Sequence, residues 1–142
     1  MREVTKDYSH SAYSSSLGLW VATWRNATGV STSSDGISWT LHTGVGSSTP
    51  DDIAWSPTEA IFVMSSIGSG AIEYSTDGST WTPATLPVGG NAGRRSIKWF
   101  PDALKFISVD DNDSLNIISS TDGITWVEET ALSAWFTGVG LL

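Results

Sequence analysis

A segment of eight residues recurs three times along this chain, and this repetition limits the possible folds more than any other feature. The copies at 33–40, 75–82 and 120–127 align without gaps, and each carries Ser, Asp-Gly and Trp at the same offsets. The first two aspartates are 42 residues apart, and the second and third are 45 residues apart. That period is typical of a β-propeller blade, which carries four strands in roughly 40 to 50 residues. The repeat therefore predicts three blades.

A second pattern, strand–turn–strand, precedes the repeated segment in each unit. It is clearest at 53–64 and 97–108, where runs of aromatic and β-branched residues flank a turn that contains Pro. The pattern recurs weakly at 11–22 and begins a fourth time at 132–142. The sequence therefore predicts three complete units and the start of a fourth.

In the second unit we expect strand A near Trp55, strand B near Phe62, strand C ending at Ser75 and strand D starting at Trp81. The Asp-Gly pair falls between C and D, where Gly accepts a positive φ and Asp can bond the amides of its own turn. The Trp that follows should pack between neighbouring sheets, because a single unit cannot bury so large an apolar side chain. We predict one all-β domain with blades at approximately 9–43, 52–85 and 96–130, and a partial fourth blade at 131–142 that could include a strand at 1–5.

Composition excludes several partners. Seven basic residues against fifteen acidic ones give a net charge of −8, and the scattered basic residues do not form a phosphate-binding surface. The chain has no cysteine, and it lacks the run of about 18 apolar residues that a membrane span needs. We expect no nucleic-acid partner, no membrane partner and no cofactor. No signal peptide is recognisable at the N-terminus, so the location stays open, with a virion or a cell surface as options.

The three copies resemble the Asp-box, or BNR, repeats of sialidase-like propellers, sortilin-type receptor domains and many bacterial and phage surface proteins. The family motif runs Ser/Thr-x-Asp-x-Gly-x-Thr-Trp, whereas in this chain Gly follows Asp directly in all three copies. The resemblance implies a propeller in which the box is a structural turn that lies away from the ligand face. It assigns a structural role to the turn residues Ser33, Asp35, Gly36, Trp39, Ser75, Asp77, Gly78, Trp81, Ser120, Asp122, Gly123 and Trp126.

The same resemblance places ligands on the face formed by the loops between blades and by the B–C loops. Trp24 is the best candidate there for an aromatic platform, and an arginine guanidinium would match the two oxygens of a carboxylate. Arg94 and Arg95 could equally pair with nearby acids, and we favour that alternative. The candidate ligand-binding residues are Trp24, Arg25, Asn26, His42, Arg94 and Arg95.

A run of acidic residues offers the hard oxygen ligands that calcium prefers, although we favour a polar hairpin loop. The run lacks the Gly and the distal Glu of an EF-hand loop, and no other metal site is expected. The weak candidate ligands are Asp110, Asp111 and Asp113.

Three functions remain open. A non-catalytic glycan-binding or adhesive component of a phage or bacterial surface apparatus is favoured, because it needs only shallow sites lined by loops. A purely structural virion or assembly protein fits the same sequence. Sialidase-like hydrolysis is disfavoured, because its Tyr–Glu pair would come from Tyr74 and Glu73, which are adjacent in one strand and should point to opposite faces.

Three blades are too few to close a propeller, because closed rings typically contain four to eight. The first and last faces of a stack of repeats need a polar cap or a symmetric partner, and no polar cap is visible in the sequence. We therefore predict that the chain binds itself, as a homodimer that completes a ring of six to eight blades.

Overall fold

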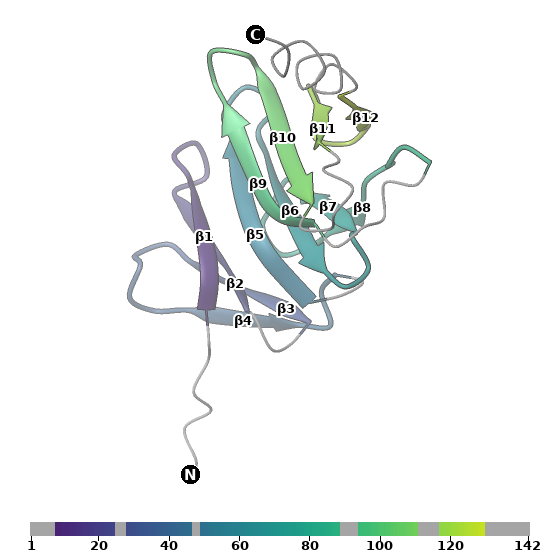
Figure 1. Ribbon diagram of the computed structural model, residues 1–142. Helices are drawn as coiled ribbons and strands as arrows, with labels where there is room; N and C mark the ends of the chain where they lie inside the picture. Colours follow the sequence, from purple (N-terminus) through teal and green to yellow (C-terminus); the bar gives the residue numbers. More distant parts are fainter. Residues whose placement is uncertain (1–7, 25–27, 47–48, 89–93, 111–116, 130–142) are drawn as a thin grey trace, which may run out of the picture.

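The computed structural model describes residues 8–24, 28–46, 49–88, 94–110 and 117–129. Within these ranges the chain forms twelve strands and no helix, so none of the described segments is a helix that could cross a membrane. The strands make three four-stranded sheets in which neighbours follow one another in chain order (Figure 1). All pairs within the sheets are antiparallel. The predicted all-β class and four-stranded blades are confirmed.

Each sheet is one blade. Blade 1 contains β1 (Tyr8–Ser14), β2 (Leu19–Trp24), β3 (Gly29–Ser33) and β4 (Thr40–Thr43). Blade 2 contains β5 (Thr49–Ser56), β6 (Ile61–Ile67), β7 (Ile72–Ser75) and β8 (Thr82–Pro83). Blade 3 contains β9 (Arg94–Phe100), β10 (Lys105–Asp110), β11 (Ile117–Ser120) and β12 (Val127–Glu128). The partial blade expected at 131–142 and the strand expected at 1–5 lie outside the described residues.

The first strands of the three blades, β1, β5 and β9, lie next to one another (Figure 1). Because side chains alternate along a strand, every sheet has two faces, and the sheet of the middle blade packs one face on blade 1 and the other on blade 3. Along β6, Phe62 and Met64 face blade 1, whereas Ile61 and Val63 face blade 3. Six of the seven residues of β6 are buried, which is expected for a strand that is covered on both faces.

Two apolar clusters hold the blades together. The cluster between blades 1 and 2 contains Val21, Val30, Ile53, Phe62 and Met64. The cluster between blades 2 and 3 contains Ala54, Ile61, Val63, Ile72, Ile97, Phe106, Ile118 and Trp126. The hydrophobic core therefore lies between the sheets, so each blade depends on its neighbours for burial.

The turn between the first two strands of each blade ends on a residue in the left-handed conformation. Blade 1 uses Gly18 at φ 60°, but blades 2 and 3 use Ala60 at 53° and Leu104 at 49°. A residue with a side chain loses about 1–2 kcal/mol of stability in this conformation. Glycine, which blade 1 has at this position, avoids that loss.

We expect Leu104→Gly to stabilise the protein by about 0.5–1 kcal/mol, because Leu104 is exposed and loses little burial. Urea unfolding measures the change. The matched control is Ala103→Gly in the same turn, where φ is not positive and added chain entropy should lower stability. A destabilised Leu104→Gly variant would contradict this account of the turn.

Candidate interaction face

The three repeated segments form one turn, which we call the Asp-Gly turn. In blade 1, Asp35 Oδ1 accepts hydrogen bonds from the amides of Ile37 (2.8 Å) and Ser38 (2.7 Å) and from the Ser33 hydroxyl (2.9 Å). The Ser33 hydroxyl oxygen accepts the Gly36 amide at 2.9 Å. The same bonds recur at Ser75–Asp77 and at Ser120–Asp122. Each carboxylate is therefore used inside its own turn.

These bonds favour the ionised carboxylates. The amides of Ser38 and Ile37, with the Ser33 hydroxyl, lower the pKa of Asp35 to about 2. Burial acts to raise the pKa of Asp122, but the amides of Thr125 and Ile124 outweigh it and the net shift is downward. The turn aspartates are therefore charged acceptors at neutral pH and poorly suited to donate protons.

Two of the three turns press their glycine against the preceding blade. A Cβ atom at Gly78 would lie 2.8 Å from Val21 Cγ2 and 3.0 Å from Leu19 Cδ2 on β2. A Cβ atom at Gly123 would lie 2.7 Å from Ile61 Cδ1 and 2.8 Å from Val63 Cγ2 on β6. At Gly36, in blade 1, only Trp20 Nε1 lies within 4 Å, at 3.9 Å. The Gly36 turn therefore has the same geometry as the other two turns, but no preceding blade packs against it among the described residues.

An aromatic pair marks the same face of every blade. Trp55 and Phe62 lie directly opposite each other on β5 and β6, with ring centroids 4.5 Å apart. Trp99 and Phe106 are paired in the same way at 4.8 Å in blade 3. Phe62 and Phe106 are fully buried, because blades 1 and 2 cover them.

The equivalent pair in blade 1 is Tyr13 and Trp20, with centroids 4.7 Å apart, and these side chains are 43% and 37% exposed. Around them, Ser11 and Ala22 occupy the positions of Ile53 and Met64 in blade 2. We call this surface the open face of blade 1 and define it by Ser11, Tyr13, Trp20, Ala22, Gly36 and Trp39.

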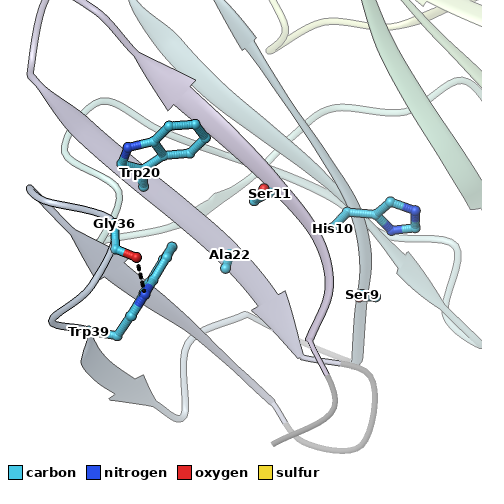
Figure 2. Close-up of a pocket in the computed structure, with 7 residues that line it drawn as sticks. All are labelled: Ser9, His10, Ser11, Trp20, Ala22, Gly36 and Trp39. Carbon is cyan, nitrogen blue, oxygen red and sulfur yellow. Dashed lines mark hydrogen bonds between the residues drawn. The ribbon is translucent and has the colours of Figure 1, made fainter.

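The open face is hollowed by a cavity of about 420 Å³ (Figure 2). The rings of Trp20 and Trp39 stand on the same side of the sheet, and Trp39 Nε1 donates to the Gly36 carbonyl at 3.2 Å. The equivalent Trp81 and Trp126 pack against the interblade clusters. The cavity is lined by Ser9, His10, Ser11, Trp20, Ala22, Gly36 and Trp39.

A polar network joins the inner strands beside this face. His10 Nδ1 donates to the Asp51 carbonyl at 2.5 Å, and its ring points toward β5, away from the tryptophans (Figure 2). In the next interface the buried Asp52 carboxylate accepts the Ile97 amide at 3.0 Å and the Lys98 ammonium at 3.2 Å. His10 of blade 1 and Asp52 of blade 2 occupy equivalent positions in their blades. Each of them links the first strand of its own blade to the first strand of the next blade.

The structure describes two of the six predicted ligand residues in side-chain detail. Trp24 is 8% exposed and its Nε1 donates to Ser31 Oγ at 3.1 Å, so its ring offers no open platform for a sugar. His42 lies on β4, where its Nε2 shares a hydrogen bond with Thr32 Oγ1 at 2.9 Å. Arg94 and Arg95 begin β9 without described side chains, and Arg25 and Asn26 lie outside the described residues.

Most of the acidic run lies outside the described residues. Asp110 ends β10, and only its backbone is described. Asp111 and Asp113 are outside the described residues. In the described parts of the chain, no three His, Asp or Glu side chains gather closely enough to hold a metal ion.

Exposed large apolar side chains occur in the two terminal blades and not in the middle one. Among the described residues, none belongs to 49–83, and one, Val88, follows blade 2. Those of blade 1 are Tyr13, Leu17, Trp20, Ile37 and Leu41. Those of blade 3 are Phe100, Leu104, Val109, Ile124 and Val127. The blade that has neighbours on both sides is therefore the one whose apolar surface is covered.

The arrangement of these blades recurs in proteins of known structure. A scan of protein families found no match, and a search of curated proteins found none either. Among solved structures, the chain is similar to streptogramin B lyase (TM-score 0.68, 13% identity, covering 89% of this chain and 42% of that one). It is similar to YCF48 from Cyanidioschyzon merolae (TM-score 0.67, 15% identity, 94% and 42%) and to nidogen in its complex with laminin (TM-score 0.66, 18% identity, 90% and 49%).

The fold is that of a β-propeller. This chain spans less than half the length of each of those three propellers. The three blades therefore correspond to part of such a propeller.

Proposed function

We propose that this chain is a non-catalytic propeller module that serves adhesion or assembly, and that the open face of blade 1 is its binding surface. The observation that carries the proposal is the Tyr13–Trp20 pair, which repeats the geometry of two other aromatic pairs but is the exposed one. Aromatic side chains contribute much of the binding energy at protein interfaces, and contiguous exposed apolar patches mark interaction sites.

The placement of the acidic groups supports a non-catalytic role. Glu73 Oε2 lies beside Gly46, on the side of β7 that faces blade 1, whereas Tyr74 packs against the cluster between blades 2 and 3. The Tyr–Glu pair that sialidase-like hydrolysis requires is thus divided between opposite faces of one sheet. The turn aspartates accept hydrogen bonds from their own turns, which leaves them poorly placed to act on a substrate.

Glycan binding is the second candidate, and the cavity favours it. Indole rings stack on the apolar faces of sugars, and polar groups around such a pocket fix the orientation of the hydroxyls. Trp20 and Trp39 supply two indoles, and Ser11 supplies a hydroxyl beside them (Figure 2). A role in a phage or bacterial surface apparatus rests on the Asp-box resemblance and is part of this proposal. If no sugar is bound, a purely structural component is the remaining function.

The test combines a glycan array with measurement of the mass in solution, using the wild type and Trp20→Ser. The matched control is Val88→Ser, which changes a fully exposed apolar residue outside the open face. We expect Trp20→Ser to lose self-association or glycan retention, whichever the wild type displays, and Val88→Ser to keep it. A Trp20→Ser chain that remains unchanged in both measurements would show that the open face is not the binding surface. Release of free sugar by the wild type would overturn the non-catalytic assignment.

A further inference from the structure

Among the described residues, the face of blade 3 that points away from blade 2 is the one that can complement the open face. By strand alternation and pairing it presents Lys98, Lys105, Ile107, Val109 and Ile117, and we call it the following face of blade 3. The corresponding faces of blades 1 and 2 are the ones that receive the next blade.

The two interblade contacts within the chain show how the open face and the following face of blade 3 would meet. Gly78 packs on Leu19 and Val21 of β2, and Gly123 packs on Ile61 and Val63 of β6. The residues of β10 at these positions are Lys105 and Ile107. A third contact of the same kind would therefore place Gly36 of one copy on Lys105 and Ile107 of another.

The two lysines on the following face do not prevent such a contact, because acids of the same chain neutralise them. Lys98 Nζ lies 3.2 Å from Asp52 Oδ2, and Lys105 Nζ lies 3.4 Å from Glu129 Oε1. The Ser119 hydroxyl also donates to Glu129 Oε1, at 2.5 Å. With its charge held by Glu129, the Lys105 stem can cover apolar surface on the same face as Ile107.

The geometry leads to a closed ring. A contact between the first face of one copy and the last face of another is heterologous, and such contacts form a ring if the rotation closes. Two copies supply six blades, within the usual range of four to eight.

We infer that the partner of the open face is a second copy of this chain, whose following face of blade 3 packs on Tyr13, Trp20 and the Gly36 turn. Two such contacts close a six-bladed ring with a two-fold axis along its centre. The inference rests on the proposed function, since it names the partner of the same face.

Two variants test it from opposite sides of the contact. Gly36→Asn adds a side chain at φ 72°, which Asn tolerates, and the single chain has room for it. Ile107→Asp places a carboxylate on the half-buried following face. Each variant is expected to lose the two-chain mass at low micromolar concentration while it keeps the circular dichroism of the wild type. Gly18→Asn is the control, because it has a similar φ of 60° and no atom within 4 Å.

Mixing the two variants gives the decisive result. In a mixed ring, the Ile107→Asp chain offers an intact open face and the Gly36→Asn chain offers an intact following face, so one of the two contacts is of wild-type sequence. We expect the mixture to recover a species of two chains, which neither variant forms alone. Failure of the mixture to recover it, or persistence of dimers in either variant alone, overturns the inference. The proposed function is judged separately by Trp20→Ser.

A chain that lacks residues 133–142 separates this contact from one made by the C-terminal residues. Dimers that persist without those residues support the inference, because the two faces that it joins remain. Loss of the dimer in a folded chain would assign the partner surface to the C-terminal residues and overturn it.

Discussion

Replacing Gly78 with Val is expected to destabilise the protein by about 2–5 kcal/mol. Gly78 has φ 77°, where a β-branched residue is strained, and its Cβ would lie 2.8 Å from Val21 Cγ2. The left-handed backbone accounts for about 1–2 kcal/mol, and overpacking the interblade contact accounts for about 1–3 kcal/mol more. Chemical unfolding at equilibrium measures the sum.

The matched control separates the two causes. Gly18→Val has a similar φ of 60° and no atom within 4 Å, so it should show the backbone cost alone. We expect Gly78→Val to be clearly less stable than Gly18→Val. Equal losses in the two variants would mean that the Asp-Gly turn does not press on β2 in solution.

The second large effect is expected at Asp52, where Asp52→Ala should lower stability by about 3 kcal/mol. Asp52 is 2% exposed, and its carboxylate accepts hydrogen bonds from the amides of Ile53 (2.9 Å) and Ile97 (3.0 Å) and from the Lys98 ammonium. Its removal leaves buried donors without an acceptor, at about 1–3 kcal/mol for each. Thermal and urea unfolding should both report the loss.

Lys98→Met is the control for the ion pair alone. The Lys98 side chain is 60% exposed, so the loss of its contact to Asp52 should cost about 1 kcal/mol or less. If Lys98→Met were as damaging as Asp52→Ala, the stability would come from the ion pair and not from the buried amide bonds between β5 and β9.

Much of the blade architecture could be predicted from the sequence because the constraining residues repeat. The Asp-Gly pairs and their tryptophans fixed the turn between the third and fourth strands, and the period fixed the number of units. In blade 2 the expected strands near Trp55 and Phe62 and the strand ending at Ser75 are confirmed, while the last strand starts at Thr82, one residue after Trp81. Local turn chemistry is readable when one residue type meets each requirement.

The open face could not be read as directly. In blade 1, Ser11 and Ala22 replace the large apolar residues of blade 2, so the alternation that marks strands A and B is weak there. Aligning Tyr13 and Trp20 with Trp55 and Phe62 is the signal that could have found the exposed aromatic pair. Trp24 is the last residue of β2, and the burial of its ring depends on tertiary packing that a single sequence does not reveal.

Other features lay beyond sequence reasoning for a physical reason. The left-handed conformation of Ala60 and Leu104 is imposed by the turn, and neither residue type signals it. The bonds of Asp52 to β9 depend on which inner strands become neighbours, and only the assembled blades determine this.

The most direct test of the central claim, that these blades are part of a ring and bind through the open face of blade 1, is the mass of the wild-type protein in solution. Sedimentation equilibrium at low micromolar concentration should give twice the chain mass of 15.1 kDa. A stable, folded species at 15.1 kDa, with the Tyr13–Trp20 face left open to solvent, would contradict the claim.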